Sequence, residues 1–283
     1  MVLIAYDMRR MGVSGMAPGP FAPGAVLIIP MSGRKIAIRL YQVFAILPWI
    51  CFVRLTAPLM RLVPRPGQNE RETCFVVTSV VRPVSSRLTY SETRSVFSAE
   101  DRIRQTEETV RSIRRAVPGA HVMVVEASAD DSGTEALAAS ADSYLHVGRS
   151  RLVRFACDGS RKSFGEAMML VAAWRRLPRA KRYFKMSGRY FLTSEFSLAS
   201  FSGEGFSFKH DRPDCAMTAL YSFSGDRMIE WLAALLISLA YAPIDYPMEY
   251  TLQKHISPRH IRSLGGPVGV AGTDGTNGAP FSR

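Results

Sequence analysis

The stretch KMSGRY places two cations and two hydroxyl groups around a Ser-Gly break at the end of an apolar run. The guanidinium of Arg189 can donate two parallel hydrogen bonds to a phosphate, and Lys185 adds a positive point charge. Ser187 and Gly188 would allow a hydroxyl and the backbone to approach a ligand closely, while Tyr190 can stack on the ligand or form a hydrogen bond with it. A simple turn, with Arg189 as an ion-pair partner, is the structural alternative. These residue types make the stretch a candidate ligand site, and an anion is a ligand that its two cations would suit.

A second candidate for anion binding is the polar loop DGSRKSFGEA, residues 158–167, which leads into a helical pattern. Backbone N–H groups and the positive dipole at a helix N-terminus attract anions, and Lys162 adds a charge there. Ser163 and Glu166 are further candidates for binding the same ligand. They also have the spacing of a capping box, in which they would only satisfy the helix end. Both interpretations stay open.

Other polar groups lie where predicted strands end. The run CFVVTSVV carries Thr78 and Ser79 and is followed by Arg82, which can meet a ribose or a phosphate. Glu126 closes the run HVMVVEAS and can accept a hydrogen bond from a base or a ribose. Ligands of open parallel sheets bind beyond the carboxyl ends of strands, near a change in strand order. The sequence therefore groups these residues with the two anion-binding stretches.

The elements that position these residues alternate between strand and helix from Arg71 onward. β-branched apolar runs predict strands at 74–81, 121–128 and 143–147, followed by the run that ends in KMSGRY. Caps and apolar periodicity predict helices between Ser98 and Gly119 and over 134–142, 163–177 and 227–242. This alternation predicts an α/β fold with a mainly parallel sheet and helices on both faces.

The N-terminal quarter differs in composition from the rest. Residues 1–33 are rich in Gly, Pro and Met and are expected to be poorly ordered. The basic segment 34–70 contains LYQVFAILPWICFV, fourteen residues between Arg39 and Arg54. A membrane span needs about 20 apolar residues, so this length favours a helix in the membrane interface, where Trp49 and the arginines fit. A tilted span and a helix packed on the protein's own surface are the alternatives.

Composition also excludes several classes of protein. The net charge of +12 is compatible with nucleic acid, a membrane or an anionic substrate, but no zinc-finger spacing, RNP-like strand or long basic run supports nucleic acid. GxSxG, GxGxxG and GxxxxGK[ST] are absent, which argues against a serine hydrolase, a dinucleotide-binding enzyme and a P-loop protein. The four cysteines form no metal-ligand cluster and suit a reducing, cytoplasmic setting.

The order TSVVRP, Glu126, KSFGEA and KMSGRY resembles the nucleotide-sugar-binding half of GT-A-type glycosyltransferases. The pair KxxGE and SGRY is similar to a group of bacterial and viral glycosyltransferase-like proteins of surface glycans. The resemblance covers residues 73–272, and it implies a GT-A-like domain at 71–272. The Gly-rich residues 273–283 are expected to form a flexible tail. It departs from the common pattern where SGRY replaces the acidic, metal-binding DxD motif.

The resemblance implies transfer of a sugar from a nucleotide diphosphate sugar to a glycan or lipid-linked acceptor, in surface polysaccharide synthesis. Without DxD no metal site is expected, and Lys162, Lys185 and Arg189 would neutralise the diphosphate instead, although Mg²⁺ or Mn²⁺ on other acids stays an alternative. An inverting displacement needs a base, for which PIDYPMEYTL offers Glu249 and Asp245. The expected location is the cytoplasmic face of the cell membrane. A non-catalytic membrane-associated scaffold of the same fold is the alternative function.

Overall fold

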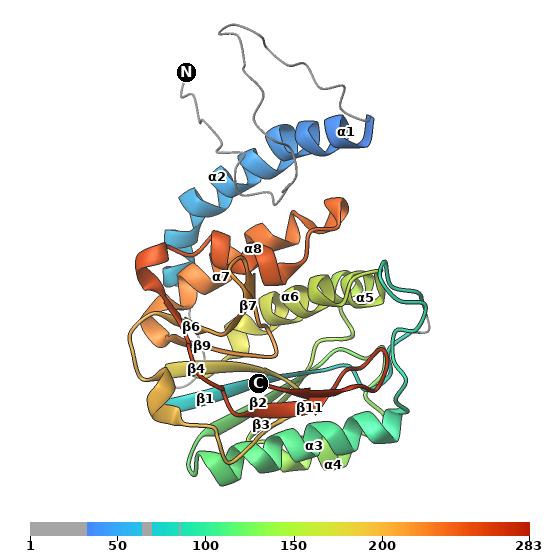
Figure 1. Ribbon diagram of the computed structural model, residues 1–283, viewed down its shortest axis with the longest axis vertical. Helices are drawn as coiled ribbons and strands as arrows, with labels where there is room; N and C mark the ends of the chain where they lie inside the picture. Colours follow the sequence, from blue (N-terminus) through green and yellow to red (C-terminus); the bar gives the residue numbers. More distant parts are fainter. Residues whose placement is uncertain (1–32, 64–69, 85) are drawn as a thin grey trace, which may run out of the picture. The chain divides into compact units, whose positions relative to one another are not determined.

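The computed structural model describes residues 33–63, 70–84 and 86–283 (Figure 1). The expectation of poor order at 1–33 therefore lies outside the described residues, apart from Gly33. The chain divides into two compact units, residues 1–37 and 38–283. Every feature of the candidate site belongs to the second unit.

A seven-stranded sheet forms the centre of this unit, in the order β10-β6-β9-β4-β1-β2-β3. Strands β1 (Arg71–Ser79), β2 (His121–Glu126), β3 (Ser143–His146) and β4 (Ala180–Ser187) run parallel. Strand β9 (Leu220–Ser224) pairs antiparallel with β4 and with β6 (Phe206–Phe208), and β10 (Ile261–Ser263) pairs parallel with β6. The mainly parallel sheet expected from the sequence is confirmed.

Helices cover both faces of the sheet because its central strands are apolar on both sides. Phe75 and Val77 of β1 pack in a core with helices α3 (Ala99–Ala116) and α4 (Glu135–Ser140). Cys74 and Val76 point to the other face, toward α5 (Arg151–Asp158), α6 (Lys162–Ala173), α7 (Met228–Leu239) and α8 (Met248–Lys254). Figure 1 shows α3 and α4 below the sheet and α5, α6, α7 and α8 above it. The predicted two-sided covering is confirmed.

The predicted N-cap of α3 is present. Ser98 Oγ accepts a hydrogen bond from Asp101 N at 3.1 Å, and Asp101 Oδ2 accepts one from Ser98 N at 3.1 Å, which completes a capping box. The remaining short helices are η4 (Trp174–Arg176), η5 (Leu198–Phe201), η6 (Gly225–Arg227), η7 (Ala242–Ile244) and η8 (Pro258–His260). Helix α5 and several of the later short elements were not anticipated.

The C-terminal residues correct one expectation. Residues 273–283 are not a flexible tail, because β12 (Pro280–Ser282) pairs with β11 (Val270–Thr273), and β11 pairs with β5 (Tyr190–Leu192). Two backbone hydrogen bonds join the ends of these strands: Val270 N donates to the carbonyl of Arg283 at 3.0 Å, and Arg283 N donates to the carbonyl of Val270 at 2.9 Å. The glycines there signal turns within a small sheet and not disorder. A two-stranded ribbon of β7 (His210–Arg212) and β8 (Cys215–Ala216) lies elsewhere in the unit.

The apolar segment of the N-terminal region is helical. It comprises α1 (Gly33–Tyr41), a π-helical turn η2 (Gln42–Ile46), α2 (Leu47–Thr56) and the 3₁₀ turn η3 (Ala57–Leu62). Pro48 lacks the N–H that an α-helix would donate four residues back, and the π turn accommodates this defect. Within residues 38–283, Trp49 Nε1 donates to the carbonyl of Leu236 on α7 at 2.9 Å. Ile46, Val53 and Ala57 form the buried side of the segment.

This helix, Lys35–Leu62, is also long and apolar enough to cross a membrane, and it is the one such helix among the described residues. Its most apolar window has a mean hydropathy of 1.9, and only 11% of that window is buried. An interfacial position, a tilted span and packing on the protein surface therefore stay predictions of the sequence.

Candidate functional site

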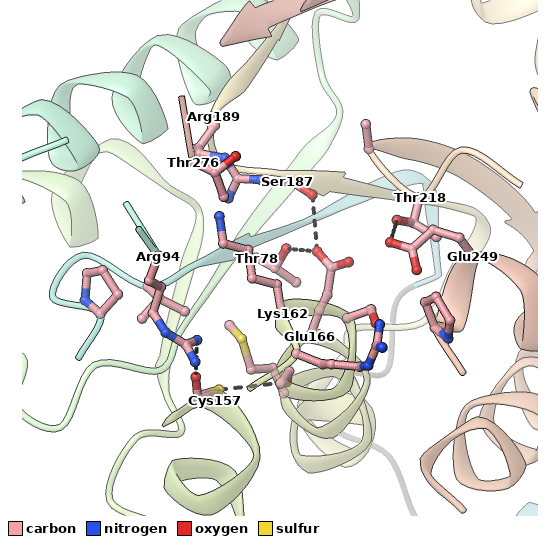
Figure 2. A pocket seen from close by; sticks show the side chains of 18 of the residues that line it. Thr78, Arg94, Cys157, Lys162, Glu166, Ser187, Arg189, Thr218, Glu249 and Thr276 are labelled. Carbon is pink, nitrogen blue, oxygen red and sulfur yellow. Dashed lines mark hydrogen bonds between the residues drawn. The ribbon is translucent and has the colours of Figure 1, made fainter. Parts of the chain in front are cut away.

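A cavity of about 510 Å³ opens beyond the carboxyl ends of β1 and β4. The first residues of α6, the start of α8 and the turn between β11 and β12 complete its wall (Figure 2). The position agrees with the rule that parallel sheets bind ligands beyond their strand ends. The sequence-predicted residues that line the cavity are Thr78, Ser79, Lys162, Ser163, Glu166, Ser187, Arg189, Tyr190 and Glu249.

One side of the cavity is strongly basic. Lys162, Arg189, Arg94 and Arg102 line it, and among the described residues none of the four forms an ion pair. Arg94 Nη1 donates to the carbonyl of Cys157 at 2.8 Å, and Arg102 Nη1 donates to Ser95 Oγ at 3.1 Å, so both are held by neutral groups. The cluster thus carries positive charge that no ion pair in the described part of the chain offsets.

The cations depress each other's affinity for protons. Burial and the neighbouring charge of Arg189 lower the pKa of Lys162 to about 8, and burial and Arg189 also lower the pKa of Arg102. Arg189 Nε is buried and has no hydrogen-bond partner in the described chain. A buried donor without an acceptor is costly, so an anion bound between these groups would remove an existing penalty.

The turn after β11 brings its backbone close to two of these cations. A Cβ atom at Gly275 would lie 3.2 Å from Arg189 Nε and 3.3 Å from Lys162 Nζ, so both cations converge on this residue. Asp274 beside it accepts a hydrogen bond from Thr276 N at 2.7 Å, and both residues line the cavity. The charge of Asp274 acts on Lys162 against the lowering of its pKa by burial and Arg189.

Glu166 organises the floor of the cavity. Its Oε1 accepts hydrogen bonds from Thr78 Oγ1 at 2.8 Å and Ser187 Oγ at 3.1 Å, and it lies 2.5 Å from Lys185 Nζ. Although burial opposes ionisation, the charge of Lys185 and these bonds hold the pKa of Glu166 below its usual value. Figure 2 shows Glu166 between the cations and Glu249.

These contacts decide between the two interpretations of Ser163 and Glu166. Helix α6 has Arg161 as its N-cap with no side-chain cap, and Ser163 Oγ instead accepts a hydrogen bond from Met248 N at 3.4 Å. The capping-box alternative is therefore wrong. Glu166 is used to join β1, α6 and β4 at the strand ends.

Lys185 is placed differently from the expectation that it faces a ligand. It is 1% exposed and is not among the residues lining the cavity, and its Nζ donates to Ser187 Oγ at 2.9 Å and the carbonyl of Thr218 at 2.6 Å. Because its charge is already paired with Glu166, Lys185 holds neighbouring residues of the site in position and does not itself face the cavity. Arg94 and Arg102, which were not anticipated, line the cavity instead.

Glu249 faces the cations across the cavity (Figure 2). Thr218 Oγ1 donates to its Oε1 at 3.3 Å, whereas its Oε2 is buried and has no partner in the described chain. Burial, together with the charge of Glu166, raises the pKa of Glu249. A carboxylate with one held oxygen, one free oxygen and a raised pKa is, once ionised, a stronger proton acceptor than an ordinary glutamate.

The other predicted residues do not line the cavity. Asp245 pairs through Oδ1 with Arg161 Nε at 2.6 Å, and Arg161 itself does line the wall. Glu126 is buried and accepts hydrogen bonds from Val81 N at 3.0 Å and Ser128 N at 2.8 Å. Arg82 is exposed, and its Nη1 donates to the carbonyl of Ser132.

Gly188 permits a close approach of elements within the protein. A Cβ atom there would lie 2.8 Å from Thr106 Oγ1 of α3, and Gly188 N donates to the carbonyl of Thr78 at 2.9 Å. The missing side chain thus allows α3 to pack against the strand ends. The tight contact is with this helix, and Gly188 is absent from the cavity wall.

The carboxylates present do not match a divalent-metal site. In the chain outside residues 1–32, 64–69 and 85, no three His, Cys, Asp or Glu residues come together as potential metal ligands. Glu166, the carboxylate at the strand ends, is engaged by an ammonium and two hydroxyl groups. Hard cations need several free oxygen ligands, which this arrangement does not offer.

Sequence reasoning missed several residues of the site. Arg102 is only 7% exposed. In the sequence it stands among the many charged residues of α3, a pattern that is typical of a solvent-facing helix. Tyr90 and Arg94 come from an irregular loop without a distinctive pattern. The Asp-Gly pair at 274–275 is a common turn sequence, but these residues were expected to belong to a flexible tail, and nothing local indicated that they meet β4 and α6.

The chain is similar to known proteins in structure and not in sequence. No protein-family model matches the chain, and no curated protein matches its sequence. A galactosyltransferase, LgtC, solved with donor and acceptor sugar analogs, is similar in structure at 7% identity and a TM-score of 0.46, over 67% of this chain and 72% of that one. A putative nucleotide-diphospho-sugar transferase from Desulfovibrio desulfuricans G20 is similar at 11% identity and a TM-score of 0.39, over 69% of this chain and 80% of that one. Both TM-scores are low, so function is argued from the residues of the site.

Proposed function

We propose that the chain is a glycosyltransferase that uses a nucleotide diphosphate sugar as donor. The observation that carries the proposal is that two kinds of group face each other across one cavity. One is a cluster of cations that form no ion pair in the described chain, and the other is a carboxylate with a free oxygen. Arg189 Nε and Glu249 Oε2 are both buried and both without a partner in the described chain. One awaits an acceptor and the other a donor, which a diphosphate and a sugar hydroxyl would supply.

In the proposed reaction the diphosphate lies against Lys162 and Arg189. Arg94 and Arg102 add positive charge, and the hydroxyl groups of Thr78 and Ser79 are available to the donor. Bond cleavage between the sugar and the diphosphate increases negative charge on the leaving oxygen. Fixed cations in a partly closed cavity stabilise that charge more than water does.

Glu249 is the proposed base. An acceptor hydroxyl loses its proton to Oε2 as its oxygen forms a bond to the anomeric carbon, while the bond from that carbon to the diphosphate breaks. The nucleoside diphosphate leaves with the electron pair of the broken bond. This single displacement inverts the anomeric carbon and needs no metal, because the four cations balance the charge of the leaving group.

We further propose a glycan or lipid-linked acceptor and a role in surface polysaccharide synthesis at the cytoplasmic face of a membrane. The support is the helix Lys35–Leu62, whose apolar residues are largely exposed. A lipid-linked acceptor is confined to the membrane surface, and an enzyme held there meets it at high local concentration. Nucleotide diphosphate sugars are the soluble partner in this scheme.

The test is thermal shift of the full chain against UDP-, GDP-, CDP- and dTDP-sugars, with Mn²⁺ and separately with a chelator. Stabilisation by one nucleotide class that survives chelation and is lost in Arg189→Ala supports the proposed donor site. Arg175→Ala is the matched control, because Arg175 is exposed and does not line the cavity. No shift with any nucleotide sugar would refute the donor site.

A second assay separates an enzyme from a scaffold that only binds. Release of nucleoside diphosphate in the presence of an acceptor extract, dependent on Glu249, indicates transfer. Binding of a nucleotide sugar with no release under any acceptor condition would favour the scaffold.

A further inference from the structure

A second hollow, of about 500 Å³, lies away from the donor cavity and shares no residue with it. Within residues 38–283 it is formed where η3 and the end of α2 meet α7 and the segment after α8. Its basic wall consists of Arg54, Arg61, Arg227 and Lys254, and its acidic residues are Asp226 and Glu230. The volume falls in the usual range for small-molecule sites.

The carboxylates of this hollow already have partners. Asp226 Oδ2 lies 3.1 Å from Arg227 Nε, and Glu230 accepts hydrogen bonds from Ser257 N at 2.9 Å and forms a pair with His260 Nδ1 at 2.8 Å. Arg54 and Arg61 make no hydrogen bond and no ion pair in the described part of the chain. Two guanidinium groups are therefore free to bind an external anion.

The lowered pKa of a histidine on the wall of this hollow agrees with an excess of positive charge there. Burial, followed by the charges of Arg54 and Lys254, lowers the pKa of His255 to about 4. The imidazole on this wall is thus neutral at physiological pH, since a further positive charge there is unfavourable. Lys254 Nζ donates a hydrogen bond to Tyr246 Oη at 2.7 Å.

The same helix presents a row of exposed apolar side chains next to these arginines. Leu55, Leu59 and Leu62 are 78%, 62% and 79% exposed, and Phe44 further along the helix is 75% exposed. Arg54 precedes Leu55, Arg61 lies between Leu59 and Leu62, and both arginines line the hollow. Apolar side chains that enter a bilayer, with arginines beside them at the level of the phosphates, form the usual arrangement of an interfacial helix.

We propose that this second hollow binds the phosphate headgroup of an anionic glycerophospholipid, while the leucines beside it enter the outer part of the same lipid leaflet. The guanidinium groups of Arg54 and Arg61 suit the phosphate because each can donate two parallel hydrogen bonds. The inference rests on the proposed membrane location, and it adds selectivity for anionic lipid and a specific site for the headgroup. It does not depend on which donor the first cavity binds.

The test is flotation of the full chain with vesicles of phosphatidylcholine alone and of phosphatidylcholine mixed with phosphatidylglycerol. Binding is expected only with the mixed vesicles. The variant Arg54→Gln/Arg61→Gln should bind them at least tenfold more weakly than the control Lys35→Gln/Arg39→Gln, which removes the same charge from the same helix. Diffuse attraction would instead weaken both variants alike, by roughly fivefold for each cation removed.

Three results would overturn the proposal: equal binding to neutral vesicles, equal loss in the two double variants, or a stable dimer that does not float, which would assign the apolar face to a second copy. Circular dichroism of both variants checks folding, and the lipid comparison on the unmodified chain needs no variant. Nucleotide-sugar thermal shifts on Arg54→Gln/Arg61→Gln separate the two proposals, because a lipid-binding defect should leave donor binding unchanged.

Discussion

The buried ammonium of Lys185 joins the two halves of the cavity, because it lies 2.5 Å from Glu166 Oε1 and donates to the carbonyl of Thr218 at 2.6 Å. Thr218 in turn donates to Glu249 through its hydroxyl. A residue of the KMSGRY stretch is therefore connected both to the strand ends near the cations and to the proposed base. Removing that charge should affect the position of both.

Lys185→Met should destabilise the fold by about 3–5 kcal/mol, because it leaves Glu166 as a buried charge without its partner. Chemical denaturation monitored by circular dichroism measures this loss. The double variant Glu166→Gln/Lys185→Met should recover much of the stability, since no unpaired charge remains. A single variant as stable as the unmodified chain would mean that the pair contributes nothing.

Glu249→Gln should retain donor binding and lower the rate of transfer by about two to four orders of magnitude, the usual contribution of a general base. Nucleotide-sugar thermal shift and nucleoside diphosphate release measure the two properties separately. Asp245→Asn is the useful comparison, because Asp245 pairs with Arg161 and does not line the cavity. A larger loss of transfer in Asp245→Asn than in Glu249→Gln would assign the base to Asp245.

The raised pKa of Glu249 also predicts the direction in which stability changes with pH. Between its unfolded and folded pKa values the native state holds more protons than the unfolded state, so stability falls as pH rises through this window. Glu249→Gln removes that dependence. The difference in unfolding free energy between the variant and the unmodified chain should therefore move in favour of the variant as pH rises from acid to neutral.

Lys162 predicts opposite effects of alkaline pH on binding and on stability. Its pKa in the free protein is about 8, against 10.5 for an unperturbed lysine. Donor affinity should be full below pH 8 and fall above it as the ammonium loses its proton. Stability should rise between pH 8 and 10.5, because the unfolded chain holds more protons there. Titrations of affinity and unfolding, each compared with Lys162→Gln, check both signs.

Gly275→Ala should weaken donor binding while changing stability little. The added Cβ would lie 3.2 Å from Arg189 Nε and 3.3 Å from Lys162 Nζ, so both flexible side chains would have to shift from their positions around the proposed anion. Gly266→Ala is a matched control, because a Cβ there meets nothing within 4 Å. Equal donor affinity in the two variants would remove Gly275 from the binding site.

Several features could be predicted from the sequence because their signals are local. The apolar runs of β1 and β2, the Ser98 cap of α3 and the strand that ends at Ser187 depend on residues close together in the chain. The rule that ligands lie beyond parallel strand ends then grouped Thr78, Lys162 and Arg189 correctly in one cavity. Alternating strands and helices were enough for the fold class.

Tertiary structure decided which of these charges are free. Lys185 and Arg189 are four residues apart in one motif. Lys185 forms an ion pair with Glu166, whereas Arg189 Nε has no hydrogen-bond partner in the described chain. Arg102 and Gly275 reach the site through α3 and the β11–β12 turn, which are distant from β4 in the chain. A sequence pattern reports periodicity and caps over a few residues, whereas pairing and desolvation depend on atoms that only the folded chain brings together. The residue types at this site were therefore visible in the sequence, and their division into support and binding was set by packing.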